Sequence, residues 1–296
     1  MTGPGAQSRF VARHAARWPE EVAAADARRL ALLALDTWAI AHHARRRGVG
    51  AAGADAAALA LPGAAPVWGG GTAEPRSAAL LNGCAAEALD FQEVLIDGRN
   101  NGHAAVVIVP ALFALAHREG TGAAEVLRGL RAAFEANVLL ARTLGRGHRA
   151  GTPGFRTTAL VAPLAAALAG GLMAGGADLA GRALSIAAAT LPAGLLAAMA
   201  PGAGDFSVDK DLSVGFSARH ALEAVLLAKA GAAGPSEALT GPRGWAASYG
   251  FGTEEPERLE APPGAVDLGA YALKLYPVNF GAQCAVRLAL DLAGGA

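Results

Sequence analysis

Charge is scarce in this chain, and what there is cancels. Of 296 residues only 17% are charged, and 25 Lys+Arg stand against 25 Asp+Glu, so the formal net charge is zero. No basic run is interleaved with aromatic residues, which argues against a nucleic-acid partner. Hydrophobic residues make up 53%, and a chain of this length buries about three quarters of its unfolded surface. We therefore expect helices packed on several sides, or a sizeable subunit interface.

Lysine and cysteine are also rare. The only lysines are Lys210, Lys229 and Lys274, so the basic side chains are nearly all arginine and each lysine needs its own explanation. The only cysteines, Cys84 and Cys284, lie in apolar helical patterns without metal-ligand spacing. They favour two buried thiols in a reducing compartment, and they indicate neither a zinc site nor a redox motif.

A leader and a membrane segment are not indicated. The first residues, MTGPGAQSRFVARHAARWPEE, lack the continuous apolar core of a signal peptide, which predicts a cytoplasmic protein. Residues 157–176 are long enough to span a bilayer. Their alanine and glycine content, the internal Pro163 and the lack of a flanking aromatic belt favour a helix buried by other helices. We expect no membrane partner.

Apolar residues recur at spacings of three and four along most of the chain, which predicts an all-α protein. No alternating strand series and no repeat interrupts this pattern. The polar segment 201–215 predicts a functional loop, because polar loops in apolar surroundings often carry function. The proline-rich, charged segment 253–265 predicts a linker. Helices are expected at residues 20–45, from Pro75 onward, and at 103–118, 121–145, 157–174, 178–199 and 215–231, with a short one within 235–250.

Seven segments, taken in order, carry a more specific pattern. Together they resemble the MmgE/PrpD family, which includes methylcitrate dehydratase, cis-aconitate decarboxylase and iminodisuccinate epimerase. The segments are LLALDTWAIA, GGGTAEPRSAALLNGCAAEALDF, GHAAVVIVPALFALAHREG, GFRTTA, KDLSVGFSARHALEAVLLAKAG, GPRGWAASYGF and LKLYPVNF.

The resemblance implies a large helical domain joined to a smaller α+β lid, usually in a homodimer, with the active site in the cleft between them. We therefore expect a helical domain over residues 1–252, a linker over 253–265, and the start of the lid region over 266–296. The lid would be only starting at Ala296, so most of it is expected to be absent. A natural shortening, a fragment, and a split enzyme with a partner chain that supplies the lid all fit this pattern.

Four residues match the family's functional motifs. Asp90 stands at the first acid of the "DFDD" signature, and His103 at the histidine of the "HPG" or "HPS" turn. Lys210 matches the lysine ahead of "LHPG", and Lys274 the lysine of "K.YP". The resemblance implies that His103 is a catalytic base with Asp90 as its partner, and that Lys210 supplies positive charge or a proton.

Other motif positions differ from the family. Arg156, Ser213 and Asn279 stand where the family has histidines, so three imidazoles are lost together. Gln92 and Glu93 replace the two later acids of "DFDD", and Val94 replaces the threonine that follows. These losses argue against a straightforward methylcitrate dehydratase or cis-aconitate decarboxylase. The residues expected to border the substrate are Arg156, Lys274, Asn279, Gln92, Tyr276 and Ser213.

The chemistry that the family shares is proton transfer at a carbon next to a carboxylate, which needs a base with a pKa near neutrality and nearby positive charge. A helix start would keep the His103 imidazole neutral. We expect a cofactor-independent lyase, a dehydratase or decarboxylase of a small organic acid in specialised metabolism, without metal or nucleotide. Two alternatives are an epimerase or isomerase of the same family, and a non-catalytic helical subunit that needs a partner chain.

Overall fold

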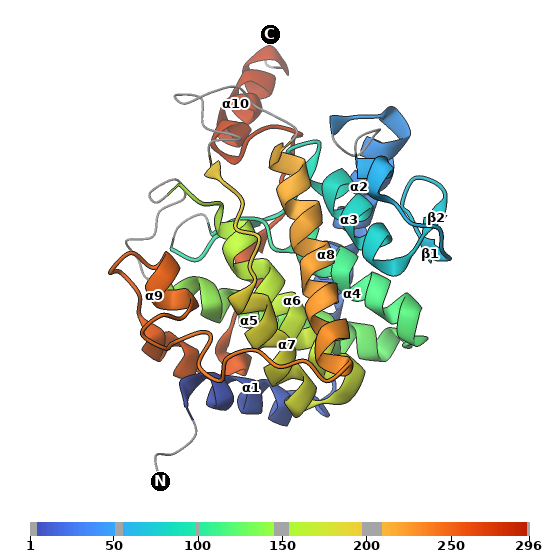
Figure 1. The fold of residues 1–296 in the computed structure, drawn as a ribbon. Helices are drawn as coiled ribbons and strands as arrows, with labels where there is room; N and C mark the ends of the chain where they lie inside the picture. The colour runs from blue at the N-terminus through green and yellow to red at the C-terminus, as the bar shows by residue number, and fades with distance from the viewer. Residues whose placement is uncertain (1–4, 51–55, 99–100, 145–153, 197–208, 295–296) are drawn as a thin grey trace.

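One apolar helix, α6 (Thr157–Gly175), runs through the centre of the molecule (Figure 1). The computed structural model describes residues 5–50, 56–98, 101–144, 154–196 and 209–294. Within these ranges α6 alone is long and apolar enough to cross a membrane, and 83% of its apolar window is buried. Its neighbours are α4 (Ala105–Glu119), α5 (Ala123–Thr143), α7 (Ala177–Ala189) and α8 (Asp209–Lys229).

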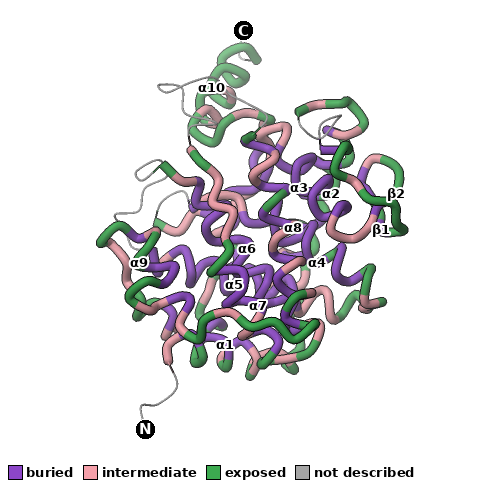
Figure 2. Tube along the Cα trace, in the orientation of Figure 1, coloured by how far each residue is buried: buried purple, intermediate pink, exposed green. Residues whose placement is uncertain are grey.

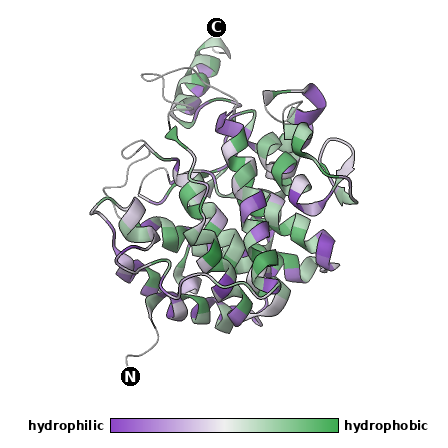
Figure 3. Ribbon diagram, in the orientation of Figure 1, coloured by the Kyte–Doolittle hydropathy of each residue, from purple (hydrophilic) through white to green (hydrophobic). Residues whose placement is uncertain are grey.

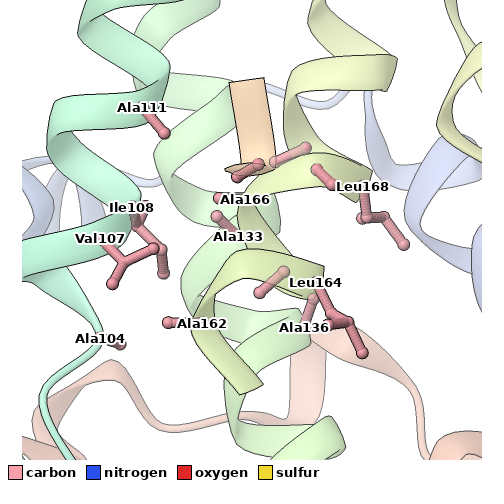
Figure 4. Packing of buried hydrophobic residues seen from close by; sticks show 14 of the residues in the cluster. Ala104, Val107, Ile108, Ala111, Ala133, Ala136, Ala162, Leu164, Ala166 and Leu168 are labelled. Atoms are coloured by element: carbon pink, nitrogen blue, oxygen red, sulfur yellow. The ribbon is translucent and has the colours of Figure 1, made fainter. Parts of the chain in front are cut away.

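Small side chains let these helices approach closely. Figure 4 shows Val107 and Ile108 of α4 on the side that faces Ala162 of α6, with Ala133 and Ala136 of α5 nearby. All five are buried. Alanine on a packed helix face allows near approach without voids, and interiors reach the density of organic crystals in this way. The high alanine content of the sequence therefore has a direct structural use.

The remaining helices surround this centre, and the predicted all-α class is confirmed. Figure 2 shows burial concentrated in the central helices, and Figure 3 shows the apolar residues gathered there. Strand structure in the described residues is limited to two short antiparallel pairs. The other elements are α1 (Ala6–Arg17), α2 (Ala24–Arg47), α3 (Pro75–Glu87), α9 (Trp245–Tyr249), α10 (Gln283–Gly294), η2 (Ala56–Leu59), η4 (Pro256–Glu260), η5 (Pro263–Ala265), η6 (Leu268–Ala270), η7 (Phe280–Ala282), β1 (Ala65–Pro66), β2 (Thr72–Ala73), β3 (Val94–Leu95) and β4 (Tyr271–Ala272).

Two helix boundaries differ from those predicted by more than four residues. Helix α7 ends at Ala189, ten residues before the predicted end at 199, because Pro192 follows and disfavours helical backbone at the residue before it. Helix α8 begins at Asp209, and not at 215. Lys210 therefore lies in the first turn of a helix and not in a loop. The predicted loop 201–215 is thus wrong for residues 209–215, where acids in a first turn suit the helix dipole, and residues 201–208 lie outside the described residues.

Only one of the two cysteines is buried. Cys84 on α3 is buried as predicted, but Cys284 on α10 is exposed, so that prediction is wrong. Helix α10 has no buried residue, and Leu288 and Leu292 on it are 59% and 69% exposed. Its apolar periodicity is real, yet no described part of the helical body covers it, and it lies at the edge of the molecule (Figure 2).

The segment after α9 lies along the helical body. Leu259, Leu268 and Tyr271 are buried in the main core. The Tyr271 hydroxyl donates to the Phe134 carbonyl at 2.8 Å and accepts from Asn137 at 3.2 Å. Strand β4 pairs antiparallel with β3. This pairing brings the segment that contains Lys274 beside the segment that follows Asp90. The division of the chain at 253–265 stays a prediction.

Helices α3 and α8 touch through their backbones at two glycines. A Cβ atom on Gly83 would lie 3.0 Å from Gly215 Cα. A Cβ on Gly215 would lie 2.3 Å from Cys84 Sγ and 2.6 Å from the Leu80 carbonyl oxygen. Glu87 follows Gly83 by one helical turn, and Lys210 precedes Gly215 by about one turn. The close crossing therefore sets the distance between Glu87 and Lys210.

We predict that Gly215→Ala destabilises the protein by about 1–3 kcal/mol, because an added methyl group overpacks this crossing. The matched control is Gly181→Ala within α7, where a Cβ would meet no atom within 4 Å. That change should stabilise the fold by roughly 0.5–1 kcal/mol through helix propensity. Urea unfolding of both variants measures the difference. A Gly215→Ala protein as stable as the control would contradict the close crossing.

Candidate active site

The centre of the candidate site is a buried carboxylate, Glu87, at the end of α3. Its side chain is 0% exposed, and Oε1 accepts from Arg156 Nη2 at 2.5 Å and from Lys210 Nζ at 3.0 Å. Oε2 accepts from Gln92 Nε2 at 2.9 Å. Burial alone would raise the pKa of Glu87, but Lys210 and Arg156, with His103, outweigh it and lower that pKa to about 2. Glu87 is therefore ionised.

Arg156 joins the start of α6 to α8. Its Nη1 donates to the Lys210 carbonyl at 2.5 Å and to Ser213 Oγ at 2.8 Å. Lys210 Nζ also donates to the Glu87 carbonyl at 3.1 Å. The structure thus brings together Arg156, Ser213, Gln92 and Lys210, all predicted site residues. Arg156 contacts protein acceptors here, and its contact with substrate stays a prediction.

Asp90 and Lys274 extend this network toward solvent. Lys274 Nζ donates to the Asp90 carbonyl at 2.5 Å and lies 3.3 Å from Asp90 Oδ1. Lys210 Nζ lies 3.9 Å from the same Oδ1. The side chain of Lys274 is 2% exposed and that of Asp90 is 31% exposed. Burial lowers the pKa of Lys274, and the attraction of Asp90 partly offsets this.

The backbone at Asp90 has φ of +50°, which lies in the left-handed region. Aspartate tolerates this region better than most residues. The reversal turns the chain directly after α3, and the side chain of Asp90 meets Lys274 as a result. Asp90, Lys210 and Lys274 are far apart in sequence, yet they lie within one network of ion pairs.

His103 lies just before α4, whose N-cap is Ala104. Its Nδ1 lies 2.5 Å from the Glu93 carbonyl oxygen. A carbonyl only accepts, so Nδ1 carries the proton and Nε2 keeps its lone pair. Burial lowers the pKa of His103, against the opposing attraction of Glu87. The main cause of the lowered pKa is thus burial, and the effect of the helix start stays a prediction.

Glu93 is a second buried carboxyl group, and unlike Glu87 it holds its proton at neutral pH. Its Oε1 accepts from the backbone N of Ala105 at 2.8 Å, while Oε2 is buried and has no partner among the described residues. Burial raises the pKa of Glu93 to about 8, and the charge of Asp36 adds to the effect. Glu93 is therefore mostly protonated at neutral pH. It ties the start of α4 to the segment that holds the His103 ring.

Two predicted residues lie farther along the chain. Tyr276 lines an apolar pocket of about 490 Å³ between the segment that includes Lys274 and α10. The Asn279 side chain accepts from Gly281 N at 2.9 Å, and among the described residues it bonds only to its own turn. Among the contacts of the described residues, none joins Asn279 to Glu87 or Asp90. Contact of Tyr276 and Asn279 with substrate stays a prediction.

Sequence reasoning missed Glu87. The available signal was weak: Glu87 is one of two acids in the mostly apolar segment NGCAAEALDF, and the other is Asp90. Such an acid has no local feature that separates a buried residue from a solvated one. Among the described ranges no three His, Cys, Asp or Glu side chains are arranged to hold a metal ion.

Residues 7–258 match the family model described as the MmgE/PrpD N-terminal domain. This range covers most of the chain and contains Glu87, Asp90, His103 and Lys210. Lys274 lies beyond it. No curated protein matches the chain in a sequence search.

We predict that Glu93→Gln changes how stability depends on pH. Between the ordinary pKa of 4.5 and about 8, folded Glu93 holds a proton that the unfolded chain releases. Wild-type stability should therefore fall as pH rises through this window, by at most about 1.4 kcal/mol per pH unit from this group. Glutamine keeps the bond to Ala105 without titrating, so the variant should gain relative stability between pH 5.5 and 8.5.

Urea unfolding at several pH values measures this effect. The control is Glu257→Gln, which alters an exposed side chain and should follow the wild-type profile. Parallel profiles for wild type and Glu93→Gln would show that Glu93 is ionised when folded.

Proposed function

Because the chain belongs to the MmgE/PrpD family, which generally contains lyases and dehydratases, we propose that it is a cofactor-independent lyase. It transfers a proton at a carbon next to a carboxylate of a small organic acid. A dehydration removes that proton and expels water, whereas a decarboxylation expels carbon dioxide and protonates the carbon that is left. The observation that carries this proposal is the His103 ring, which has its Nε2 lone pair available beside a network that contains Lys210 and Lys274.

His103 is the proposed base. Its Nε2 takes the proton from carbon, and the electron pair of that C–H bond moves toward the neighbouring carboxylate as negative charge develops on its oxygens. In a dehydration the C–O bond to the β-hydroxyl then breaks, and the imidazolium returns the proton, so that water leaves. The pKa of His103, lowered by burial, keeps the ring neutral and ready to accept.

Lys210 and Lys274 are the proposed electrostatic residues. Their ammonium groups are fixed by Glu87 and Asp90, so they need not reorganise when charge develops on the substrate. Asp90 pairs with Lys274 and is partly exposed to solvent. We therefore propose that the substrate enters the site beside Asp90. Since the Glu93 carbonyl already holds the His103 ring, the proposed task of Asp90 is to position the lysines.

We predict that His103→Asn lowers the exchange of the substrate α-proton with solvent by roughly 10²- to 10⁴-fold, the usual contribution of a general base. The measurement is NMR of small hydroxy acids in D2O. His117→Asn is the matched control, because His117 is exposed near the other end of α4. Exchange without net elimination would identify the epimerase alternative. Unchanged activity in His103→Asn would favour a non-catalytic subunit.

We also predict an acid limb at low pH in the rate profile. Only neutral His103 accepts a proton, and burial lowers its pKa from the ordinary 6.5. The rate should therefore stay level as pH falls through 6.5 and decline only below it. The profile of kcat/KM for α-proton exchange against pH measures this. An inflection at or above 6.5 would rule out His103, as placed here, as the base.

A further inference from the structure

The backbone of the proposed base is held by a side chain of another helix. Thr158 is the second residue of α6, and its Oγ1 accepts from the backbone N of His103 at 3.0 Å. Thr158 is 4% exposed, so water does not readily replace its hydroxyl as the acceptor. This bond joins two residues that lie 55 positions apart in the sequence.

The two segments can approach closely because Gly102 lies between them. Its φ is +90°, in the left-handed region that glycine adopts without strain. A Cβ atom on Gly102 would lie 2.7 Å from Thr158 Oγ1 and 2.9 Å from Thr158 N. The chain just before His103 therefore rests directly on the first turn of α6, with no room for a side chain between them.

Backbone bonds to Leu95 in β3 hold the same loop along its length. Asn101 N donates to the Leu95 carbonyl at 2.9 Å, and Leu95 N donates to the Gly102 carbonyl at 3.0 Å. These bonds set the register of the loop against β3. The bond from His103 to Thr158 adds an attachment to α6, so the loop is fixed to two separate elements.

The proton on the His103 ring depends on where this backbone lies. Nδ1 is 2.5 Å from the Glu93 carbonyl oxygen, and this contact keeps the proton on Nδ1. A shift of the backbone would lengthen the contact, and a hydrogen bond is lost near 3.5 Å, roughly an ångström farther. The ring could then carry its proton on Nε2, which has no lone pair in that tautomer.

The same turn of α6 also holds the carboxylate network. Arg156, at the N-cap of α6, pairs with Glu87, and Thr158, two residues later, accepts from His103. One helix start therefore contacts both the ion pairs and the base. It sets their positions relative to each other.

From this arrangement we infer that Thr158 is a positioning residue for the proposed base: its hydroxyl holds the His103 backbone so that Nε2 keeps its lone pair. The inference rests on the proposed function, because it concerns how the same base is held. It requires no contact between Thr158 and the substrate. Thr158→Val removes the acceptor at nearly constant side-chain size, whereas Thr158→Ser keeps it.

The first measurement needs no substrate. In the ¹⁵N-labelled full chain at pH 7.5, NMR shifts of the His103 ring distinguish a nitrogen that carries a proton from one that does not. In wild type and Thr158→Ser, Nδ1 should carry the proton. Thr158→Val should give a mixture of the two tautomers, and its His103 amide should exchange with solvent about tenfold faster, since one hydrogen bond is lost.

The second measurement is α-proton exchange in D2O, with malate and 3-hydroxybutyrate as probes. Thr158→Val should lower kcat by about 10- to 100-fold with KM nearly unchanged, because a displaced base is less effective while substrate binding is unaltered. Thr158→Ser should keep most of the wild-type kcat. The matched control is Thr143→Val, which removes a buried hydroxyl that donates to the Leu139 carbonyl within α5. It should leave the His103 tautomer and kcat unchanged.

A wild-type ring with its proton on Nε2 would overturn the inference, and so would an unprotected His103 amide in wild type. The same holds if Thr158→Val keeps the wild-type tautomer and kcat, or if Thr158→Ser behaves like Thr158→Val. Circular dichroism checks that each variant is folded. If Thr158→Val does not fold, Thr158→Ala removes the same acceptor and takes its place, and the two wild-type measurements still decide.

The proposed function fails separately. Ring and amide signals that follow Thr158 in a protein without α-proton exchange would refute the lyase while the inference stands. Exchange that is lost in His103→Asn but unchanged in Thr158→Val would refute only the inference.

Discussion

The buried Glu87 carboxylate is the interaction on which the site depends. It joins the end of α3 to Arg156 at the start of α6 and to Lys210 in the first turn of α8. Leaving such buried charges unpaired typically costs about 3–5 kcal/mol, whereas apolar residues in the same place are often as stable. The network thus adds little net stability over an apolar core. The network instead fixes the positions of the cationic side chains, because each cation stays beside its counter-ion.

The helical packing makes this network possible. Gly83 and Gly215 let α3 and α8 touch, and Glu87 and Lys210 lie about one turn from that crossing. The β3–β4 pair then adds Lys274, which reaches Asp90 from a segment 184 residues away. A site built from four segments therefore depends on a core of small side chains, since larger ones would separate the helices and lengthen every ion pair.

Much of the fold followed from the sequence, and part of the site did not. The continuous apolar composition of residues 157–174 predicts α6 closely, because a helix covered on all sides is apolar throughout. The helical class is a property of such local patterns. Glu87 was missed because its partners lie 69 and 123 residues away. Lys210 was assigned to a loop because charge is a poor guide to backbone conformation. The exposure of Cys284 depends on what covers α10, which no local pattern contains.

Glu87 and Glu93 show how environment alone can divide the roles of two like residues. Both are buried, yet the pKa of Glu87 falls to about 2 beside two cations, and the pKa of Glu93 rises to about 8 beside none. His103 interacts with both, since the Glu93 carbonyl fixes its tautomer and the charge of Glu87 opposes the loss of basicity on burial. Pairs of titratable groups that are driven apart in this way are typical of acid–base sites. An ionised Glu93 would add a negative charge that repels the paired anion Glu87, so the neutrality of Glu93 is a condition for Glu87 to remain the anion that organises the site.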